Sequence, residues 1–178
     1  VPFIVTVYSV DSYFNITSTN TSASIQTYDD IYDVDPGTRA LITSTTFSLT
    51  LYTKSDNMPQ AKSRLRATDG AFGLTDYDYE TPNSRSYVIV NHDTTQSNYV
   101  VLVLAPGETQ TDGKWNAAPY GKTLSAGVPD TQVAGTQFTL TVDLVDKYYN
   151  LVTVSPPNVN VTLSDNDPNN ASGRASPW

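Results

Sequence analysis

The chain contains one segment twice, and this repeat limits the possible folds more than any other feature. Residues 3–15 read FIVTVYSVDSYFN and residues 138–150 read FTLTVDLVDKYYN, so seven of thirteen positions are identical at an offset of 135 residues. With one extra residue in the second copy, the similarity continues from residues 25–29 to residues 161–165. A repeat this long predicts consecutive domains rather than the short stacked units of a solenoid.

Both ends of the chain fall inside a repeat. The first copy starts at Val1, the counterpart of Thr136, and the second copy stops at Trp178, near the counterpart of position 42. We therefore expect an excerpt of a longer polypeptide. Its expected parts are a repeat lacking its first strand at residues 1–95, an inter-repeat joint with a loop insert at 96–134, and the beginning of a second repeat at 135–178.

Hydrophobic residues alternate with polar ones at a period of two, which is typical of strands with one buried face. Phe3, Val5 and Val7 alternate with Ile4, Thr6 and Tyr8, and residues 138–145 repeat the pattern. Further strands are expected at 23–28, 39–43, 46–53, 61–67, 86–91, 98–104 and 159–163. Short strands separated by Asn, Asp, Pro, Gly and Ser predict an all-β sandwich, with residues 68–85 as a long loop.

The segment 106–133 shows no alternation. One interpretation is an interdomain linker or loop pinned by Trp115 and Tyr120, and the other is a surface that binds a partner. Residues 98–104 are apolar on both faces, so they could instead form the opening, fully covered strand of the second unit. That alternative places the domain boundary near residue 95.

Composition excludes several classes of function. The chain has no Cys, which removes disulfides, thiol nucleophiles and cysteine–zinc sites. A net charge of −8 with only ten Lys and Arg argues against nucleic acid as a partner. No apolar run is long enough to span a membrane. An acidic composition rich in Ser, Thr and Asn favours an exported protein.

Residues 134–150, AGTQFTLTVDLVDKYYN, and 159–165, VNVTLSD, resemble the bacterial immunoglobulin-like repeats of very large secreted and cell-surface proteins. The resemblance implies immunoglobulin-like antiparallel β-sandwich repeats in tandem, the second incomplete here. It also implies a structural unit of an extracellular bacterial surface stalk, adhesin or filament. The expected partners are adjacent repeats or identical subunits. The truncated second copy would leave Phe138, Leu140 and Val142 bare unless a neighbour or the continuing chain covers them.

An Asp-x-Tyr-x-Asn motif follows the repeated strand in both copies. Asp and Asn side chains hydrogen-bond the backbone two residues on, so this spacing predicts a tight connection with the Tyr at the edge of the core. The predicted structural turns comprise Asp11, Tyr13 and Asn15 in the first copy and Asp146, Tyr148 and Asn150 in the second.

Acidic loops recur at one place in the repeat and provide oxygen ligands of the kind that calcium requires. A calcium site is expected from carboxylates at the following positions, and the competing interpretation is a solvated acidic loop: Asp29, Asp30, Asp33, Asp35, Asp165 and Asp167.

Exposed aromatic residues could stack on sugar rings, which makes a glycan-binding module the alternative function. The candidate contacts in polar loops are Tyr28, Tyr32, Tyr77 and Tyr79. The competing interpretation is that these rings pack over loop backbone. Asn-x-Ser/Thr triplets, which accept glycans only in cells that modify this motif, begin at Asn15, Asn20, Asn160 and Asn170.

Catalysis finds little support in the sequence. The only His, His92, lies beside Asp93, and a lone His of this kind is expected at the surface rather than as a general base. No spacing singles out a pair of carboxylates. We expect a protein without enzymatic activity.

Overall fold

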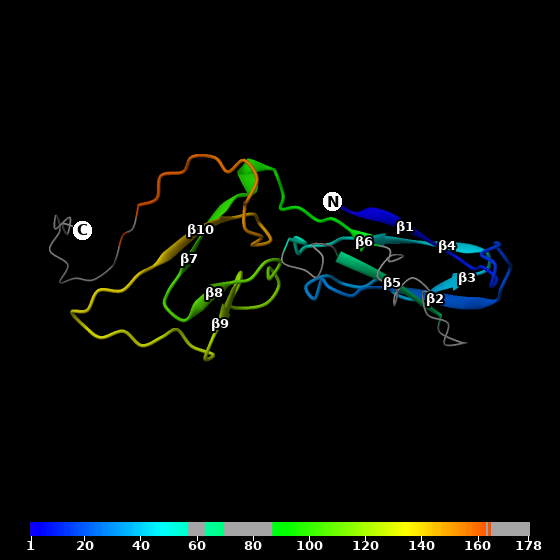
Figure 1. Ribbon diagram of the computed structural model, residues 1–178, viewed down its shortest axis with the longest axis horizontal. Coiled ribbons are helices and arrows are strands. Elements are labelled where there is room, and N and C mark those ends of the chain that lie inside the picture. Colours follow the sequence, from blue (N-terminus) through cyan, green and yellow to red (C-terminus); the bar gives the residue numbers. More distant parts are fainter. Residues whose placement is uncertain (57–62, 70–86, 163, 165–178) are drawn as a thin grey trace.

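The computed structural model describes residues 1–56, 63–69, 87–162 and 164 (Figure 1). These residues form strands joined by loops, with one 3₁₀ helix and no α-helix, so the all-β prediction is confirmed for this part of the chain. The elements are β1 (Phe3–Tyr8), β2 (Thr21–Thr27), β3 (Arg39–Leu41), β4 (Ser44–Leu49), β5 (Ser63–Asp69), β6 (Tyr87–Val88), η2 (Gln96–Asn98), β7 (Val100–Leu104), β8 (Glu108–Gln110), β9 (Lys122–Leu124) and β10 (Thr141–Val145).

Strands β1 to β6, which we call the first unit, form two sheets that enclose one core. In the first sheet β1 pairs with β4 antiparallel, with Phe3 opposite Leu49. The second sheet has the order β3-β2-β5-β6. The core residues come from both sheets, so the sheets pack face to face: Ala23, Ile25, Leu41, Phe47, Leu49 and Leu65.

The alternation of side chains in β1 places one face against the core and the other in solvent, as the sequence predicts. Phe3, Val5 and Val7 pack against the core, while Ile4 and Tyr8 are exposed on the other face. Phe47 in the partner strand is completely buried. Burying a side chain of this size contributes about 1.5–3 kcal/mol, so the burial of Phe47 helps to hold β4, and β1 paired with it, on the second sheet.

Strands β7 to β10, which we call the second unit, contain a pair and a hairpin. β10 pairs with β7 antiparallel, and Leu102, Leu104 and Val145 form a small buried cluster. If residues 98–104 open the second unit, as the alternative interpretation of the sequence has it, they should pair with a strand of that unit, and β7 does so. However, β7 is not covered on both faces, because Val101 and Val103 are exposed.

The exposed face of this two-stranded sheet is apolar. Val103 lies opposite Val142, and both side chains remain exposed, as does Phe138 before the strand. The expected strand at 159–163 is wrong for its described part, because residues 159–162 form no strand. Val159 and Val161 are exposed there, since no neighbouring strand pairs with them within the described residues.

The segment 106–133 contains a hairpin that the sequence analysis missed. The Glu108 N–H donates to the Ala105 C=O across Pro106-Gly107, and β8 then pairs with β9, with Thr109 opposite Thr123. Gly107 has a φ of +85°, as the third position of a type II turn requires. These strands are short and polar except for Leu124, so hydrophobic alternation cannot reveal them.

Several strand boundaries also differ from expectation: β3 ends at Leu41 rather than at residue 43, and β6 ends at Val88 rather than at residue 91. β4 ends at Leu49 rather than at residue 53, and the Asp30 side chain accepts hydrogen bonds from the Tyr52 and Thr53 amides that follow. β10 begins at Thr141 rather than at residue 138. Within the described residues, no helix has the length and hydrophobicity needed to cross a membrane.

Candidate functional site

The candidate site is the contact between the two units, which we call the inter-unit contact. On the first unit it consists of residues 50–56, which follow β4. The buried Asp30 carboxylate accepts hydrogen bonds from the Tyr52 N–H (2.6 Å), the Thr53 N–H (3.0 Å) and the Thr53 hydroxyl (2.7 Å). A buried carboxylate needs such donors, because an uncompensated charge in the interior is costly. Asp30 therefore ends β4 and fixes the shape of this segment.

The second turn, residues 146–151, is built around the Asp146 carboxylate. Its Oδ1 accepts hydrogen bonds from the N–H groups of Tyr148 (2.8 Å) and Asn150 (2.9 Å), and the Asn150 side-chain amide also donates to it. Tyr149 adopts a φ of +66°, and Val145 forms a bridge with Leu151. These bonds reverse the chain within five residues.

The second turn is inserted against the first unit. The Asn150 side chain accepts a hydrogen bond from the Lys54 N–H and donates one to the Tyr52 C=O, both at 2.8 Å. The Asp146 Oδ2 accepts a third bond from the Asp93 N–H at 2.7 Å. Because Asn150 and Asp146 are almost completely buried, these bonds connect the units without competition from water.

The hairpin β8–β9 and its loop also take part in the inter-unit contact. The Asp112 carboxylate accepts hydrogen bonds from the Leu151 N–H (2.8 Å) and the Gln110 side chain (2.9 Å). Gly113 lies so close to the first unit that an added Cβ would be 1.9 Å from the Thr53 hydroxyl oxygen. The Asn116 side chain donates to the Tyr32 C=O. The segment 106–133, which belongs to the second unit, therefore contacts both the second turn and the first unit.

Three aromatic rings meet at the same place. The ring centroid of Tyr52 lies 4.8 Å from that of Trp115 and 4.9 Å from that of Tyr148, and Trp115 and Tyr148 are 6.0 Å apart. Tilted and edge-on aromatic pairs at these distances add about 0.5–1.5 kcal/mol each beyond their area. Tyr120 stacks on Tyr149 nearby. The aromatic cluster thus combines one residue of the first unit with two of the second.

The connector between β6 and β7 carries further polar contacts. Burial acts to raise the pKa of Asp93, but hydrogen bonds from Thr95, Asn98 and Lys147 lower it well below its ordinary value. His92, expected at the surface, is instead buried with 4% exposure. Its ring lies 6.1 Å from that of Tyr99, so packing rather than solvation determines its environment.

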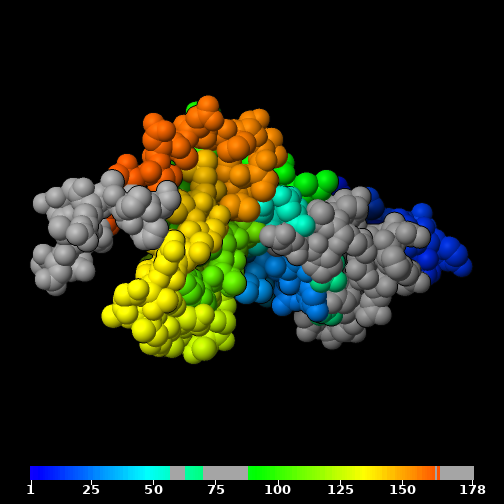
Figure 2. All heavy atoms as spheres, turned by 60° about the vertical axis from the view of Figure 1, so that its left-hand side comes forward, coloured from blue at the N-terminus to red at the C-terminus, as the bar shows by residue number. Residues whose placement is uncertain are grey.

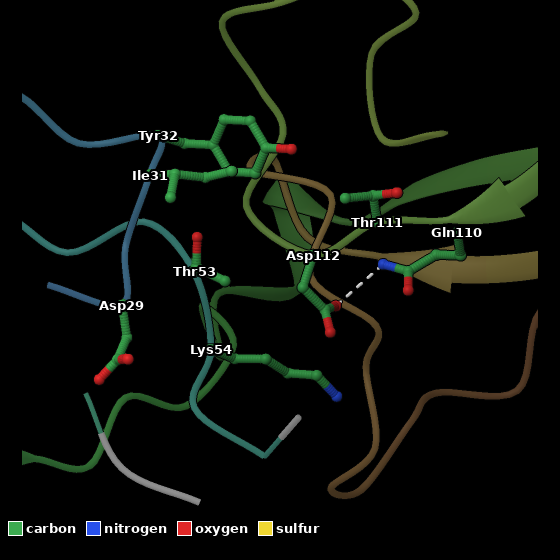
Figure 3. A pocket seen from close by; sticks show the side chains of 8 residues that line it. All are labelled: Asp29, Ile31, Tyr32, Thr53, Lys54, Gln110, Thr111 and Asp112. Carbon is green, nitrogen blue, oxygen red and sulfur yellow. Dashed lines mark hydrogen bonds between the residues drawn. The ribbon is translucent and has the colours of Figure 1, made fainter. Parts of the chain in front are cut away.

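A pocket of about 330 Å³ opens beside the inter-unit contact. Figure 3 shows that three segments line it: Asp29, Ile31 and Tyr32 from one loop, Thr53 and Lys54 from the segment after β4, and Gln110, Thr111 and Asp112 from β8 and its loop. The lining combines a Tyr ring with charged and amide groups.

The first turn, residues 11–16, repeats the bonds of the second. The Asp11 Oδ1 accepts hydrogen bonds from the Tyr13 and Asn15 N–H groups, both at 2.9 Å. The Asn15 backbone and side chain, together with the Tyr13 N–H, lower the pKa of Asp11. This turn is exposed, with Tyr13 at 83%. In Figure 2 the blue residues at the right-hand end of the molecule lie away from the yellow and orange residues of the second unit.

The acidic loop of the first unit uses its carboxylates as acceptors. Asp29 forms a bidentate ion pair with Arg64. Asp33 and Asp35 both accept from the Thr27 hydroxyl. Desolvation, together with the charges of Asp30 and Asp35, raises the pKa of Asp33 to about 6, although the Thr27 bond acts in the opposite direction.

The described part of the chain contains no cluster of three or more His, Cys, Asp or Glu placed to hold a metal. The Asp29 carboxylate accepts hydrogen bonds from Arg64, and the Asp30 carboxylate accepts them from backbone amides. Asp165 and Asp167 lie outside the described residues. Calcium binding stays a prediction.

The candidate glycan contacts are separated. The Tyr28 ring is 49% exposed and carries the Arg64 guanidinium 4.5 Å from its centroid, whereas Tyr32 lines the pocket. Tyr77 and Tyr79 lie outside the described residues.

Three of the four candidate glycosylation sites can be placed. Asn20 and Asn160 are exposed. Asn15 is also exposed, but its side-chain nitrogen donates to Asp11. Asn170 lies outside the described residues.

Sequence reasoning missed the first-unit half of the inter-unit contact. Tyr52, Lys54 and Asp93 contribute mainly backbone groups, which no side-chain motif reports. The repeated turn was the one available signal for this contact. Its second copy follows the segment 106–133, whose Trp115 and Tyr120 are large aromatic residues that favour packing.

Comparisons of the chain with known protein families, with curated proteins and with solved structures found no match.

Proposed function

We propose that this chain is a structural unit of an extracellular bacterial surface stalk, adhesin or filament, in which consecutive units are held at a fixed angle. The observation that carries this proposal is the burial of the second turn in the inter-unit contact. Asn150 is 2% exposed and bonds two backbone groups of the first unit. A flexible linker would not need such a contact, whereas a load-bearing array needs one at every joint.

The strand order supports an immunoglobulin-like sandwich for the first unit. In such domains strands B and E share one sheet and strands C, F and G share the other. Here β1 pairs with β4, and β2, β5 and β6 are neighbours in the second sheet. β3 pairs with β2 and so takes the position of the additional strand that variable-type immunoglobulin domains have in this sheet. The antiparallel pair of β7 with β10 corresponds to strands A and B of a following domain.

The apolar face of the second unit supports assembly with further strands. Val101, Val103 and Val142 form an exposed face, and Val142 is the counterpart of Val7, which packs into the core of the first unit. Strands that cover this face would complete a second sandwich. We propose that the adjacent repeat sequence or an identical subunit provides them.

Labelling of whole cells tests the proposed location and architecture. Antibodies raised against this chain, bound to intact producing cells and visualised by immunogold electron microscopy, should mark extended surface structures. Labelling confined to the cell interior would contradict the proposal. The same images report whether the labelled structures are stalks or filaments.

A glycan-binding module is the second candidate. The observation that favours it is the pocket, where the Tyr32 ring lies among charged and amide side chains such as Lys54 and Gln110. Sugars bind in sites that combine an aromatic face with a few polar groups. A glycan array probed with the chain and with Tyr32→Ala tests this function: binding that the substitution abolishes would support it, and no binding would exclude it for the glycans present.

A further inference from the structure

The first turn has the same internal structure as the second turn. Phe14 has a φ of +64° and Tyr149 one of +66°. Each Asp N–H donates to the Asn C=O four residues later, and each turn is closed by an equivalent bridge, Val10 with Ile16 and Val145 with Leu151. Both Asn side chains also donate to the carboxylate of their own turn. The two turns therefore present the same groups in the same geometry.

The two turns differ in what covers them. In the second turn Asp146 is completely buried, and Asn150 accepts the Lys54 N–H. In the first turn no described residue donates to the corresponding oxygen of Asn15. The amide that connects the units in one copy is therefore open to solvent in the other.

Exposed apolar side chains surround the first turn. Tyr13, Phe14 and Ile16 are 83%, 66% and 63% exposed, and the nearby Ile42 is 61% exposed. Ile42 lies near the turn, because the Thr43 C=O accepts the Ser9 N–H before the turn and the Ile42 C=O accepts the Thr19 N–H after it. Figure 1 places the connection between β1 and β2 at the end of the first unit that is opposite the second unit. Several exposed apolar side chains around an amide oxygen that accepts no hydrogen bond from a described residue are typical of a protein interface.

From these observations, which rest on the proposed function, we propose that the first turn is the docking surface for another unit of the same kind. That unit would present its equivalent of residues 52–54 and 93, with a free backbone C=O and N–H for Asn15 and an aromatic ring for Tyr13. The chain's own residues 52–54 are occupied by Asn150. The partner is therefore a unit whose corresponding end is free, standing before the first unit in an array.

A tandem chain tests the docking directly. Residues 1–135 fused to the complete chain join Gly135 to Val1 in the register of the internal repeat, because Val1 is the counterpart of Thr136. Segmental isotope labelling then allows the Lys54 amide of the leading copy to be followed separately by NMR hydrogen exchange. We expect this amide to be protected, and Asn15→Ala in the trailing copy to accelerate its exchange about tenfold or more.

Controls separate the possible failures. Asn20→Ala in the trailing copy removes an exposed Asn outside the turn and should leave Lys54 protected. If the leading Lys54 amide exchanges freely while that of the trailing copy is protected by its own Asn150, the docking proposal is wrong and the proposed function survives. If Lys54 is unprotected even in the single chain, the proposed function loses its main support.

A turn exchange in the single chain provides a second test, should the tandem chain fold poorly. Lys147→Ser, Tyr149→Phe and Leu151→Ile convert the second turn into the sequence of the first. We expect the Lys54 amide to stay protected, because Asp146 and Asn150 are retained. Exchange as fast as in Asn150→Ala would show that the first turn's sequence cannot dock.

Discussion

Replacing Asn150 by Ala removes the two hydrogen bonds that connect the second turn to the first unit. The Lys54 N–H and the Tyr52 C=O each lose a partner at 2.8 Å. A buried polar group without a partner costs about 1–3 kcal/mol. Two such groups predict that Asn150→Ala destabilises the chain by about 2–6 kcal/mol, a large part of the total of about 5–15 kcal/mol for a native protein.

The chain itself provides a matched control. Asn15→Ala removes the same side chain from the same turn, with the same bonds to its Asp, but no bonds to another unit. Because this turn is exposed, the control should cost only about 0.5–1 kcal/mol. The difference between the two variants therefore isolates the inter-unit contact.

Urea unfolding monitored by circular dichroism measures both variants. If the contact couples the units, they unfold together in one transition, and Asn150→Ala should allow each unit to unfold alone. The single unfolding transition then separates into two, so the apparent m-value should fall. Equal destabilisation by Asn15→Ala and Asn150→Ala, with unchanged m-values, would refute this reasoning.

Four further predictions concern the contact and the acidic loop. Gly113→Ala should destabilise the chain by about 1–3 kcal/mol in urea unfolding, because the new Cβ meets Thr53 at a positive φ of +74°; an unchanged midpoint would contradict the close approach. Asp30→Asn should cost about 2–4 kcal/mol, because an amide replaces a carboxylate that accepts four hydrogen bonds, and equal stability would refute its role in ending β4. The raised pKa of Asp33, about 6, means that the folded chain binds this proton more tightly than the unfolded chain, so its contribution is present at low pH and is lost as pH rises through 6. Asp33→Asn should therefore raise the melting midpoint at pH 7 and flatten the decline between pH 4 and 6. Melts with excess calcium and with chelator test the calcium prediction, which expects the wild-type midpoint to rise with calcium and to rise less in this variant.

The strands of the first unit could be predicted from the sequence, although not all of their ends, because their signal lies in side chains that alternate between core and solvent. For example, the spacing of Phe3, Val5 and Val7 predicts that they share one face, and all three pack against the core. The hairpin β8–β9 could not be predicted in this way, because pairs such as Thr109 with Thr123 are polar and Leu124 is the one apolar residue of its two strands.

The inter-unit contact was predictable on one side only. The motif of Asp146, Tyr148 and Asn150 is visible as a repeat, but its partners are a backbone C=O and backbone N–H groups. Those groups become available because the buried Asp30 ends β4 and shapes residues 50–56. The sequence presented Asp30 as one of several acidic residues, and only tertiary packing distinguishes it from its neighbours.

A distance measurement between the units tests the central claim most directly. The chain has no Cys, so Ser18→Cys and Thr131→Cys, both at exposed positions, introduce the only two sites for spin labels. Pulsed electron paramagnetic resonance should give one narrow distance distribution, which Asn150→Ala broadens. A broad distribution in the chain that keeps Asn150, or a distribution that Asn150→Ala leaves unchanged, would contradict the claim that the second turn fixes one unit on the other.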